Sequence, residues 1–311
     1  MHHVIGIDAG GTKTHGLLAD ADGRVVAEAV GPAANISTGG ELAVEKALHQ
    51  VIDQLLASRD VAPAAIAIGM AGAERPEDFA YVNAILHRLA RRTRTLVVND
   101  ALIALVAGAG DGPGVVLISG TGSIAYGRSR GNRSARAGGW GYVLADEGSG
   151  YWIGRQALTA VMREFDGRGP ATALTPVILS HLGLGGAIEI GPRVYRGDLA
   201  VAAIAALAPL VGAAAAAGDA VAGAIMGGAA EELSRAAAAV IRALDMGTDE
   251  FPCLLSGGTL GLESLAADVA RHVARAAPGA RVRRLAEPPA AGAVRLALEE
   301  LAGGASLPRP R

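Results

Sequence analysis

Three segments of this chain share one pattern, a short apolar run that leads directly into a turn rich in glycine, and this pattern constrains the fold most. The first segment, residues 4–14, reads VIGIDAGGTKT. Its apolar residues predict a buried strand, and its glycine pair lets the chain reverse so that backbone N–H groups can face an anion at close range. We therefore expect a phosphate-binding hairpin made by Gly10, Gly11, Thr12 and Lys13.

Asp8 stands at the end of the strand that leads into this hairpin. A magnesium ion keeps several water ligands and takes one or two carboxylates from a protein, while nucleotide phosphates complete its shell. The sequence thus predicts that Asp8 holds Mg²⁺ through water.

Two better-known phosphate loops do not fit this segment. In the P-loop pattern G-x-x-x-x-G-K-[ST], Thr12 takes the place of the lysine and Lys13 comes one position late. The dinucleotide pattern G-x-G-x-x-G matches no window here. An ordinary hairpin turn between two strands stays open as the alternative, since glycine pairs are common turn formers.

The other two segments are residues 115–123, VVLISGTGS, and residues 254–260, LLSGGTL. In the third segment, residues 254–260, the two glycines have no side chains, so a flat ring or a ribose could approach the backbone there. Strand-glycine-glycine-helix joints are frequent in α/β proteins, so the order of the three segments along one chain is the stronger signal. The turn residues expected to bind nucleotide are Gly120, Thr121, Gly122, Gly257 and Gly258.

Length and patterning predict two α/β domains, because 311 residues are many for a single core. Strand and helix patterns alternate from the opening hairpin, with one helix expected at about residues 40–58, and predict a mixed sheet covered by helices. The glycine-rich run 108–114 is the expected hinge, and beyond it the pattern begins again. We therefore expect domains at residues 1–113 and 114–311, with a last helix at about 289–303 that packs back on the first domain.

Charge and cysteine content argue against several classes of partner. The 28 basic and 30 acidic residues give a net charge of −2, which supplies no field to attract nucleic acid or an anionic membrane. The single cysteine, Cys253, cannot form an internal disulfide, so a reducing cytoplasm is expected, and the first residues show no secretory signal. Residues 199–218 are uncharged and of spanning length, but they are mostly alanine, and Pro209 interrupts them; packed alanine-rich helices are expected.

Taken in order, the motifs resemble the N-acetylglucosamine kinase group of the BadF/BadG/BcrA/BcrD ATPase family, in the sugar kinase, actin and chaperone-ATPase superfamily. The segments that carry the resemblance are residues 8–14, 99–100, 119–123, 138–141 (GGWG), 146–149 (DEGS) and 256–258. The resemblance implies a duplicated actin-like, ribonuclease H-like α/β fold with an interdomain cleft. It also implies a cytoplasmic homodimer that uses ATP and Mg²⁺ to phosphorylate the 6-hydroxyl of an amino sugar, N-acetylglucosamine or glucosamine.

Asp100 is the expected catalytic base. It follows an apolar strand pattern and precedes a helix pattern, so its carboxylate should lie at the carboxyl edge of a sheet, where ligand crevices of α/β proteins occur. A carboxylate there can accept the proton of the acceptor hydroxyl as the γ-phosphoryl group arrives. By position alone, a simple helix cap is an equal alternative, and the resemblance favours the base.

Trp140 lies between glycines, as suits a loop that packs an indole against the apolar C–H face of a sugar. A core tryptophan pinned by tight turns is the alternative. The resemblance implies a sugar pocket lined by Asn35, Ser37, Asp100, Thr121, Gly139, Trp140, Gly141 and Asp146.

Other members of this superfamily fit less well. An electron-transferring activator would need at least two cluster cysteines per chain, and this chain has one. A second sugar-kinase branch carries a cysteine-rich zinc motif that is missing here. A sugar sensor without catalytic activity stays open as the alternative function. The sequence leaves the sugar undecided among N-acetylglucosamine, glucosamine, N-acetylmuramate and glucose.

Overall fold

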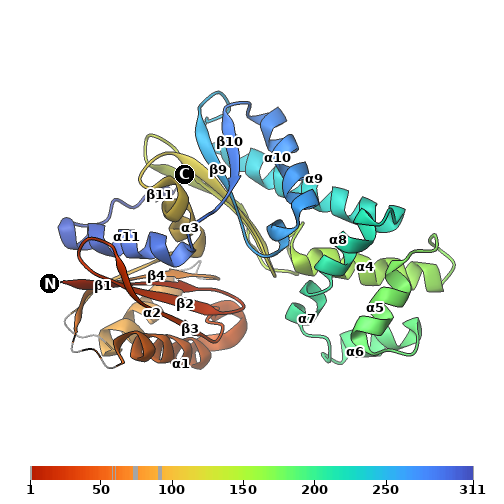
Figure 1. Ribbon diagram of the computed structural model, residues 1–311, viewed down its shortest axis with the longest axis horizontal. Helices are drawn as coiled ribbons and strands as arrows, with labels where there is room; N and C mark the ends of the chain where they lie inside the picture. The colour runs from red at the N-terminus through yellow and green to blue at the C-terminus, as the bar shows by residue number, and fades with distance from the viewer. Residues whose placement is uncertain (1, 58, 60, 73–75, 90–92, 311) are drawn as a thin grey trace. The chain divides into compact units, whose positions relative to one another are not determined.

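The computed structural model describes residues 2–57, 59, 61–72, 76–89 and 93–310, with the backbone alone described for residues 37–39, 76 and 89. The chain divides into two compact units (Figure 1). The first comprises Met1–Val116, Tyr126–Ala135 and Leu285–Arg311, and the second comprises Leu117–Ala125 and Arg136–Arg284.

The first unit is built on a sheet with strand order β3-β2-β1-β4-β5. Strands β1 (His3–Ala9), β2 (Thr14–Ala19) and β3 (Val25–Gly31) run antiparallel as consecutive hairpins. Strands β4 (Pro63–Met70) and β5 (Arg94–Asn99) continue the sheet in parallel with β1. The predicted mixed sheet is therefore confirmed, and its parallel part brings the carboxyl ends of β1, β4 and β5 to one edge.

Alternate residues of these strands face two different cores, as the period of a strand requires. Ile5 and Ile7 pack on one face with residues of α1 (Ile36–Leu56) and α2 (Pro76–Leu89). Val4 packs on the other face with residues of α3 (Asp100–Ala109) and α11 (Pro289–Ala302). Helices thus cover both faces of the sheet, and α11 comes from the far end of the chain.

Helix α1 begins earlier than the expected residue 40, because the chain is already helical at Ile36. Gly40 has a φ of 71° inside this helix, so the chain kinks there. A left-handed residue interrupts the helical pattern, and glycine is the residue that adopts it at low cost. The sequence pattern therefore starts at the kink and misses the turn before it.

The other sheet has the strand order β10-β9-β6-β7-β8-β11. Its strands are β6 (Gly114–Ser119), β7 (Ser123–Arg128), β8 (Arg133–Gly138), β9 (Phe251–Ser256), β10 (Ala280–Arg284) and β11 (Arg309–Pro310). Strands β9 and β10 belong to the second unit and β11 to the first, while β6, β7 and β8 have residues in both. Cys253 is buried in β9, and burial raises the pKa of its thiol to about 12.

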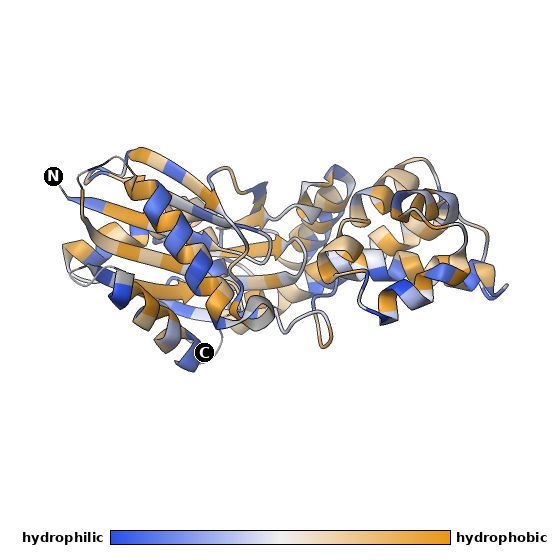
Figure 2. Cartoon of the chain, turned by 90° about the horizontal axis from the view of Figure 1, so that it is seen from below, coloured by the Kyte–Doolittle hydropathy of each residue, from blue (hydrophilic) through white to orange (hydrophobic). Residues whose placement is uncertain are grey.

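The second unit carries most of the helices: α4 (Gly150–Phe165), α5 (Leu174–Leu182), α6 (Ile190–Tyr195), α7 (Val201–Ala205), α8 (Ala208–Ala216), α9 (Ala220–Ala243) and α10 (Glu263–Ala276), with short 3₁₀ turns at Ala187–Glu189 and Thr259–Gly261. Ser149 caps α4 and Asp219 caps α9 through side-chain oxygens that accept backbone N–H groups. Figure 2 shows hydrophilic and hydrophobic residues mixed along the helices.

The alanine-rich stretch at 199–218 forms α7 and α8, which confirms the expected pair of helices. Pro209 lies in the first turn of α8, where a proline is tolerated because that N–H has no intrahelical partner. Within the described residues, no single helix is both long and apolar enough to cross a membrane. Two bent pairs of helices reach that length and apolar composition only when their two members are taken together: Leu174–Leu182 with Ala187–Tyr195, and Val201–Ala216 with Ala220–Ala243.

Candidate active site

The turn between β1 and β2 is closed by its own backbone. The N–H of Gly10 donates to the carbonyl of Lys13 at 3.0 Å, and the carbonyl of Gly10 accepts from Ala34 at 3.1 Å. Thr14 is buried, and its hydroxyl donates to the Pro32 carbonyl at 2.6 Å. The turn is therefore fixed against residues 32–34, and Asn35 follows directly, with its Nδ2 atom 3.7 Å from where a Cβ of Gly11 would lie.

Two carboxylates meet at the edge of the first unit's sheet. Asp8 is the last residue but one of β1 and pairs with Gly69 of β4, and Asn99, the residue before Asp100, pairs with Met70 of the same strand. Burial and the neighbouring Asp100 carboxylate raise the pKa of Asp8 to about 7, although the Lys13 ammonium opposes this rise. A divalent cation would relieve both causes at once, so this pair of oxygen donors fits a hard cation such as Mg²⁺.

The start of α3 shows how Asp100 is placed. Asn99 is the N-cap residue, and its side chain accepts from the Ala101 N–H at 2.9 Å. Asp100 is the first helical residue, half-buried, and its Oδ1 lies 2.9 Å from the same N–H. The side chains of Asn99 and Asp100 therefore both accept from the first free N–H of the helix, and Asn99 caps it from outside.

Hydrogen bonds within the second unit hold the turn after β6. The Gly120 N–H donates to the Gly122 carbonyl at 2.9 Å. The Gly120 carbonyl accepts from the N–H of Gly150 at 2.7 Å and from the hydroxyl of Thr259 at 3.0 Å. The Thr121 carbonyl accepts from the N–H of Tyr151 at 3.3 Å. The beginnings of α4 and of the 3₁₀ turn after β9 therefore converge on this turn.

Gly257 brings the third glycine turn against the second. Its φ is 93°, and a Cβ at this position would lie 2.3 Å from the carbonyl oxygen of Ser119. Only glycine fits both the conformation and the approach. Gly258, by contrast, has a φ of −64° and open space around it. Two of the predicted nucleotide turns are therefore adjacent in the second unit.

The Trp140 loop follows β8 and bends at glycines. Gly138, Gly139 and Gly141 have φ values of 75°, 74° and 87°. The indole is 62% exposed, and the guanidinium carbon of Arg136 lies 3.9 Å from the ring centroid. Trp140 is therefore presented at the surface of the second unit and not pinned in a core.

Asp146 joins the second turn to the Trp140 loop. Its carboxylate accepts backbone hydrogen bonds from Ser123 and Gly141, and its side chain is buried. Burial raises the pKa of Asp146, although these two hydrogen bonds oppose the rise. Its Oδ2 lies 2.7 Å from where a Cβ of Gly122 would be, so glycine at 122 leaves room for the carboxylate.

The sequence did not predict the serine hydrogen bonds that connect the turn after β6 to residues 147–149 and cap α4. Ser119 donates to the Gly148 carbonyl and Ser123 donates to the Glu147 carbonyl, each at 2.9 Å. Ser149 accepts from the N–H of Trp152 at 3.1 Å and so starts α4. The serines of both motifs are visible in the sequence, but their partners lie more than twenty residues away in two of the three bonds.

The structure thus places the expected site residues in two groups. The first unit brings together Asp8, Gly10, Gly11, Thr12, Lys13, Asn35 and Asp100 around the carboxyl edge of its sheet. The second unit holds Gly120, Thr121, Gly122, Gly139, Trp140, Gly141, Asp146, Gly257 and Gly258. Ser37 lies in the first turn of α1, and its side chain is outside the described residues. Among the residues that are described, no three His, Cys, Asp or Glu side chains form a metal cluster.

Known proteins resemble this chain over most of its length. Residues 5–298 match the sequence model of the BadF/BadG/BcrA/BcrD ATPase family. The chain is 38% identical, over 84% of its length and 86% of the relative, to the N-acetylmuramic acid/N-acetylglucosamine kinase of Clostridium acetobutylicum. It is 32% identical, over 94% of its length and 97% of the relative, to the N-acetyl-D-glucosamine kinase of Dictyostelium discoideum.

A solved structure extends the likeness to the fold. One such structure is the crystal structure of a Chromobacterium violaceum protein that is named as an N-acetylglucosamine kinase. It superposes on this chain with a TM-score of 0.75 at 30% sequence identity, and the match covers 96% of this chain and 99% of that one. This likeness confirms the expected α/β fold of the actin-like ATPases.

Proposed function

The chain belongs to the BadF/BadG/BcrA/BcrD ATPase family, and we propose that within it the protein transfers the γ-phosphoryl group of ATP to the 6-hydroxyl of an amino sugar. The products are the sugar 6-phosphate and ADP. N-acetylglucosamine is the proposed acceptor, because both curated relatives described above are named as kinases of this sugar. The structural observation that carries the proposal is the pair of carboxylates, Asp8 and Asp100, at one sheet edge.

The two glycine turns are proposed to hold the nucleotide. Backbone N–H groups of the first turn, with Lys13, are proposed to bind phosphate oxygens, and the turn at Gly120, Thr121 and Gly122 is proposed to do the same. Gly257 and Gly258 supply the surface for the ribose and the base. Asp8 holds Mg²⁺ through water, and the bound ion neutralises negative charge on the phosphate oxygens.

Asp100 is proposed to act as the base. Its carboxylate accepts the proton from the sugar 6-hydroxyl, while the oxygen of that hydroxyl forms a bond to the γ-phosphorus. The bond from the γ-phosphorus to the bridging oxygen of ADP breaks, and ADP leaves with that oxygen. Proton transfer to a positioned side chain contributes about 10²- to 10⁴-fold to such reactions.

Trp140 is proposed to bind the sugar by stacking its exposed indole on the apolar C–H face of the ring. The other proposed contacts to the sugar come from Asn35, Ser37, Thr121, Gly139, Gly141 and Asp146. In this proposal the chain works as two actin-like domains, residues 1–113 and 114–311, in a cytoplasmic homodimer. These finer points rest on the family resemblance.

Phosphorus NMR of the reaction products tests the position of transfer. The protein is incubated with ATP, Mg²⁺ and either N-acetylglucosamine or its 6-deoxy analogue. We expect a new phosphomonoester signal coupled to the two C6 protons, and no product from the 6-deoxy sugar. Phosphate on another carbon, or equal turnover of the 6-deoxy sugar, would contradict the proposal.

A further inference from the structure

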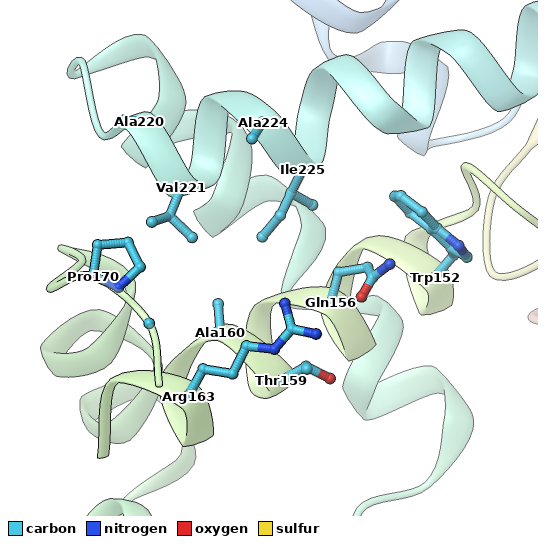
Figure 3. Close-up of a pocket in the computed structure, with 11 residues that line it drawn as sticks. Trp152, Gln156, Thr159, Ala160, Arg163, Pro170, Ala220, Val221, Ala224 and Ile225 are labelled. Atoms are coloured by element: carbon cyan, nitrogen blue, oxygen red, sulfur yellow. The ribbon is translucent and has the colours of Figure 1, made fainter. Parts of the chain in front are cut away.

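We propose that a pocket between α4 and α9, in the second unit, binds a small monoanion with an extended apolar body. The pocket has a volume of about 440 Å³, within the range that holds small organic ligands (Figure 3). None of its lining residues belongs to the groups proposed to bind ATP or sugar. The residues that line it are Trp152, Gln156, Thr159, Ala160, Arg163, Gly169, Pro170, Ala220, Val221, Ala224 and Ile225.

The two walls of the pocket differ in chemistry. Helix α4 presents Gln156, Thr159 and Arg163, whose spacings of three and four residues put them in one row along a helix face. The facing wall consists of alanine, valine and isoleucine side chains from the first turns of α9. Figure 3 shows Val221 and Ile225 pointing across the pocket toward this row. The lining therefore suits a ligand that is polar along one side and apolar along the other.

Trp152 and Arg163, at the two ends of the α4 wall of the pocket, each lie against a glycine. A Cβ at Gly228 of α9 would lie 3.3 Å from Cη2 of Trp152, so the indole rests against the helix there. A Cβ at Gly169 would lie 2.9 Å from the Cβ of Arg163, so the stem of this arginine rests against the loop after α4. Trp152 and Arg163 are roughly 16 Å apart along the helix, because each residue adds about 1.5 Å. The shape matches an elongated ligand.

Hydrogen bonds hold the loop that closes the arginine end. Gly169 donates its N–H to the Arg163 carbonyl at 3.0 Å. Asp219, at the start of α9, accepts from the hydroxyl of Thr172 at 3.0 Å and from the N–H of Ala173 at 2.7 Å. The pocket is thus a built feature of the unit, since its loop is tied to both helices.

The charge at this end selects the ligand class. Among the described residues, no carboxylate forms an ion pair with Arg163. Nearby acids have other partners: Glu164 accepts from Thr172 and Thr175, Asp166 pairs with Arg168, and Asp219 caps α9. A guanidinium forms strong bidentate bonds with a carboxylate, so the anionic group belongs at Arg163 and the apolar body against α9.

Calorimetric titration of the full-length protein tests this site, with decanoate as the probe and decanol and decyltrimethylammonium as neutral and cationic counterparts. We expect decanoate to bind with a Kd at least tenfold lower than either counterpart. Arg163→Gln should raise the Kd of decanoate at least tenfold. Arg155→Gln is the matched control, because Arg155 is an exposed residue of the same helix outside the lining, and it should change the Kd less than twofold.

A second variant, Ala224→Leu, fills the pocket from an exposed helical position and should weaken binding at least tenfold without lowering the unfolding temperature. Equal binding of the three probes, or unchanged binding in Arg163→Gln, would overturn the proposal. The proposal would also be overturned if decanoate did not bind and Ala224→Leu changed the sedimenting mass. In that case the pocket would be an interface between two copies of this chain. Sugar-dependent ADP release is not needed for any of these outcomes, so the proposed function stands or falls separately.

Discussion

The turn after β1 and the turn after β6 share a sequence pattern but differ in their surroundings. Around the first turn lie Asp8, Asp100 and Lys13; burial and the Asp100 carboxylate raise the pKa of Asp8 to about 7, and the Lys13 ammonium opposes this rise. At the second turn, the Gly120 and Thr121 carbonyls accept from backbone N–H groups, and the Gly120 carbonyl also accepts from the hydroxyl of Thr259. The first turn thus has two carboxylates and an ammonium around it, whereas the second has one buried carboxylate, Asp146, beside Gly122 and is otherwise held by neutral hydrogen bonds.

This difference suggests how a duplicated fold divides the work of phosphoryl transfer. A base and a metal ligand need carboxylates close together, which costs stability until a cation binds. A phosphate cradle needs only backbone N–H groups in a fixed turn. We infer that the first unit supplies the reacting charges and that the second supplies a rigid surface.

Asp100→Asn removes the proposed base without changing the size of the side chain. We expect turnover to fall by about 10²- to 10⁴-fold, because the acceptor hydroxyl loses its proton acceptor. Asn99 still caps α3, so the fold and the sugar-induced shift in unfolding temperature should be preserved. ADP release and thermal unfolding measure the two quantities. Near-normal turnover would show that the first unit does not supply the base.

Asp8→Asn weakens the proposed magnesium site. The Mg²⁺ concentration needed for half-maximal activity should rise by about 10- to 100-fold, the range seen when a group that acts on a metal indirectly is lost. Asp22→Asn, an exposed acid in the turn after β2, is the control and should leave that concentration unchanged. An unchanged magnesium dependence in Asp8→Asn would place the ion elsewhere.

Gly257→Ala and Gly258→Ala form a matched pair in the second unit. Alanine at 257 must adopt a φ of 93° against the Ser119 carbonyl, whereas alanine at 258 meets open space. We expect a loss of about 1–3 kcal/mol in the free energy of unfolding for the first change and less than about 0.5 kcal/mol for the second. Urea denaturation gives both values. Similar losses in the two variants would argue against a rigid second turn.

Trp140→Ala tests the sugar loop. The indole is 62% exposed, so the unfolding free energy should change little, while the KM for the sugar should rise by about tenfold. The KM for ATP should stay within twofold. A loss of stability without a change in sugar KM would mean that the residue serves the fold alone.

The metal-free protein should show a pH effect from Asp8. Its pKa is raised from 3.8 to about 7 in the folded state, so the associated stability is present below about pH 4 and is lost as the pH rises through 7. Asp8→Asn removes this contribution, and its unfolding temperature should exceed that of the wild type by a few degrees at pH 8 and by less at pH 5. A constant difference between pH 5 and pH 8 would contradict the assigned cause.

The local features of this fold could be predicted from sequence, whereas the contacts between distant segments could not. Apolar runs before Asp8 and Asp100 identify the strands that bring these residues to one sheet edge. The kink at Gly40 breaks the period on which helix prediction relies. The approach of Gly257 to Ser119, and the bond from Thr259 to Gly120, join residues more than 130 positions apart. No local pattern encodes such pairs.

The site shows the same limit. Asp146 was expected from the resemblance to line the sugar pocket, and that role stays a prediction. Its carboxylate accepts from the backbone of Ser123 and Gly141, which fixes the loop that carries Trp140. A sequence gives the presence of such an acid but not the direction of its hydrogen bonds, because these depend on the packing of three separate segments.

The most direct test is the release of ADP by the wild-type protein with ATP and Mg²⁺, measured against N-acetylglucosamine, glucosamine, N-acetylmuramate and glucose. We expect turnover that depends on the sugar, is greatest with N-acetylglucosamine and is lost in Asp100→Asn. ADP release that is independent of every sugar, or absent while sugars still shift the unfolding temperature, would contradict a kinase and point to a sugar sensor.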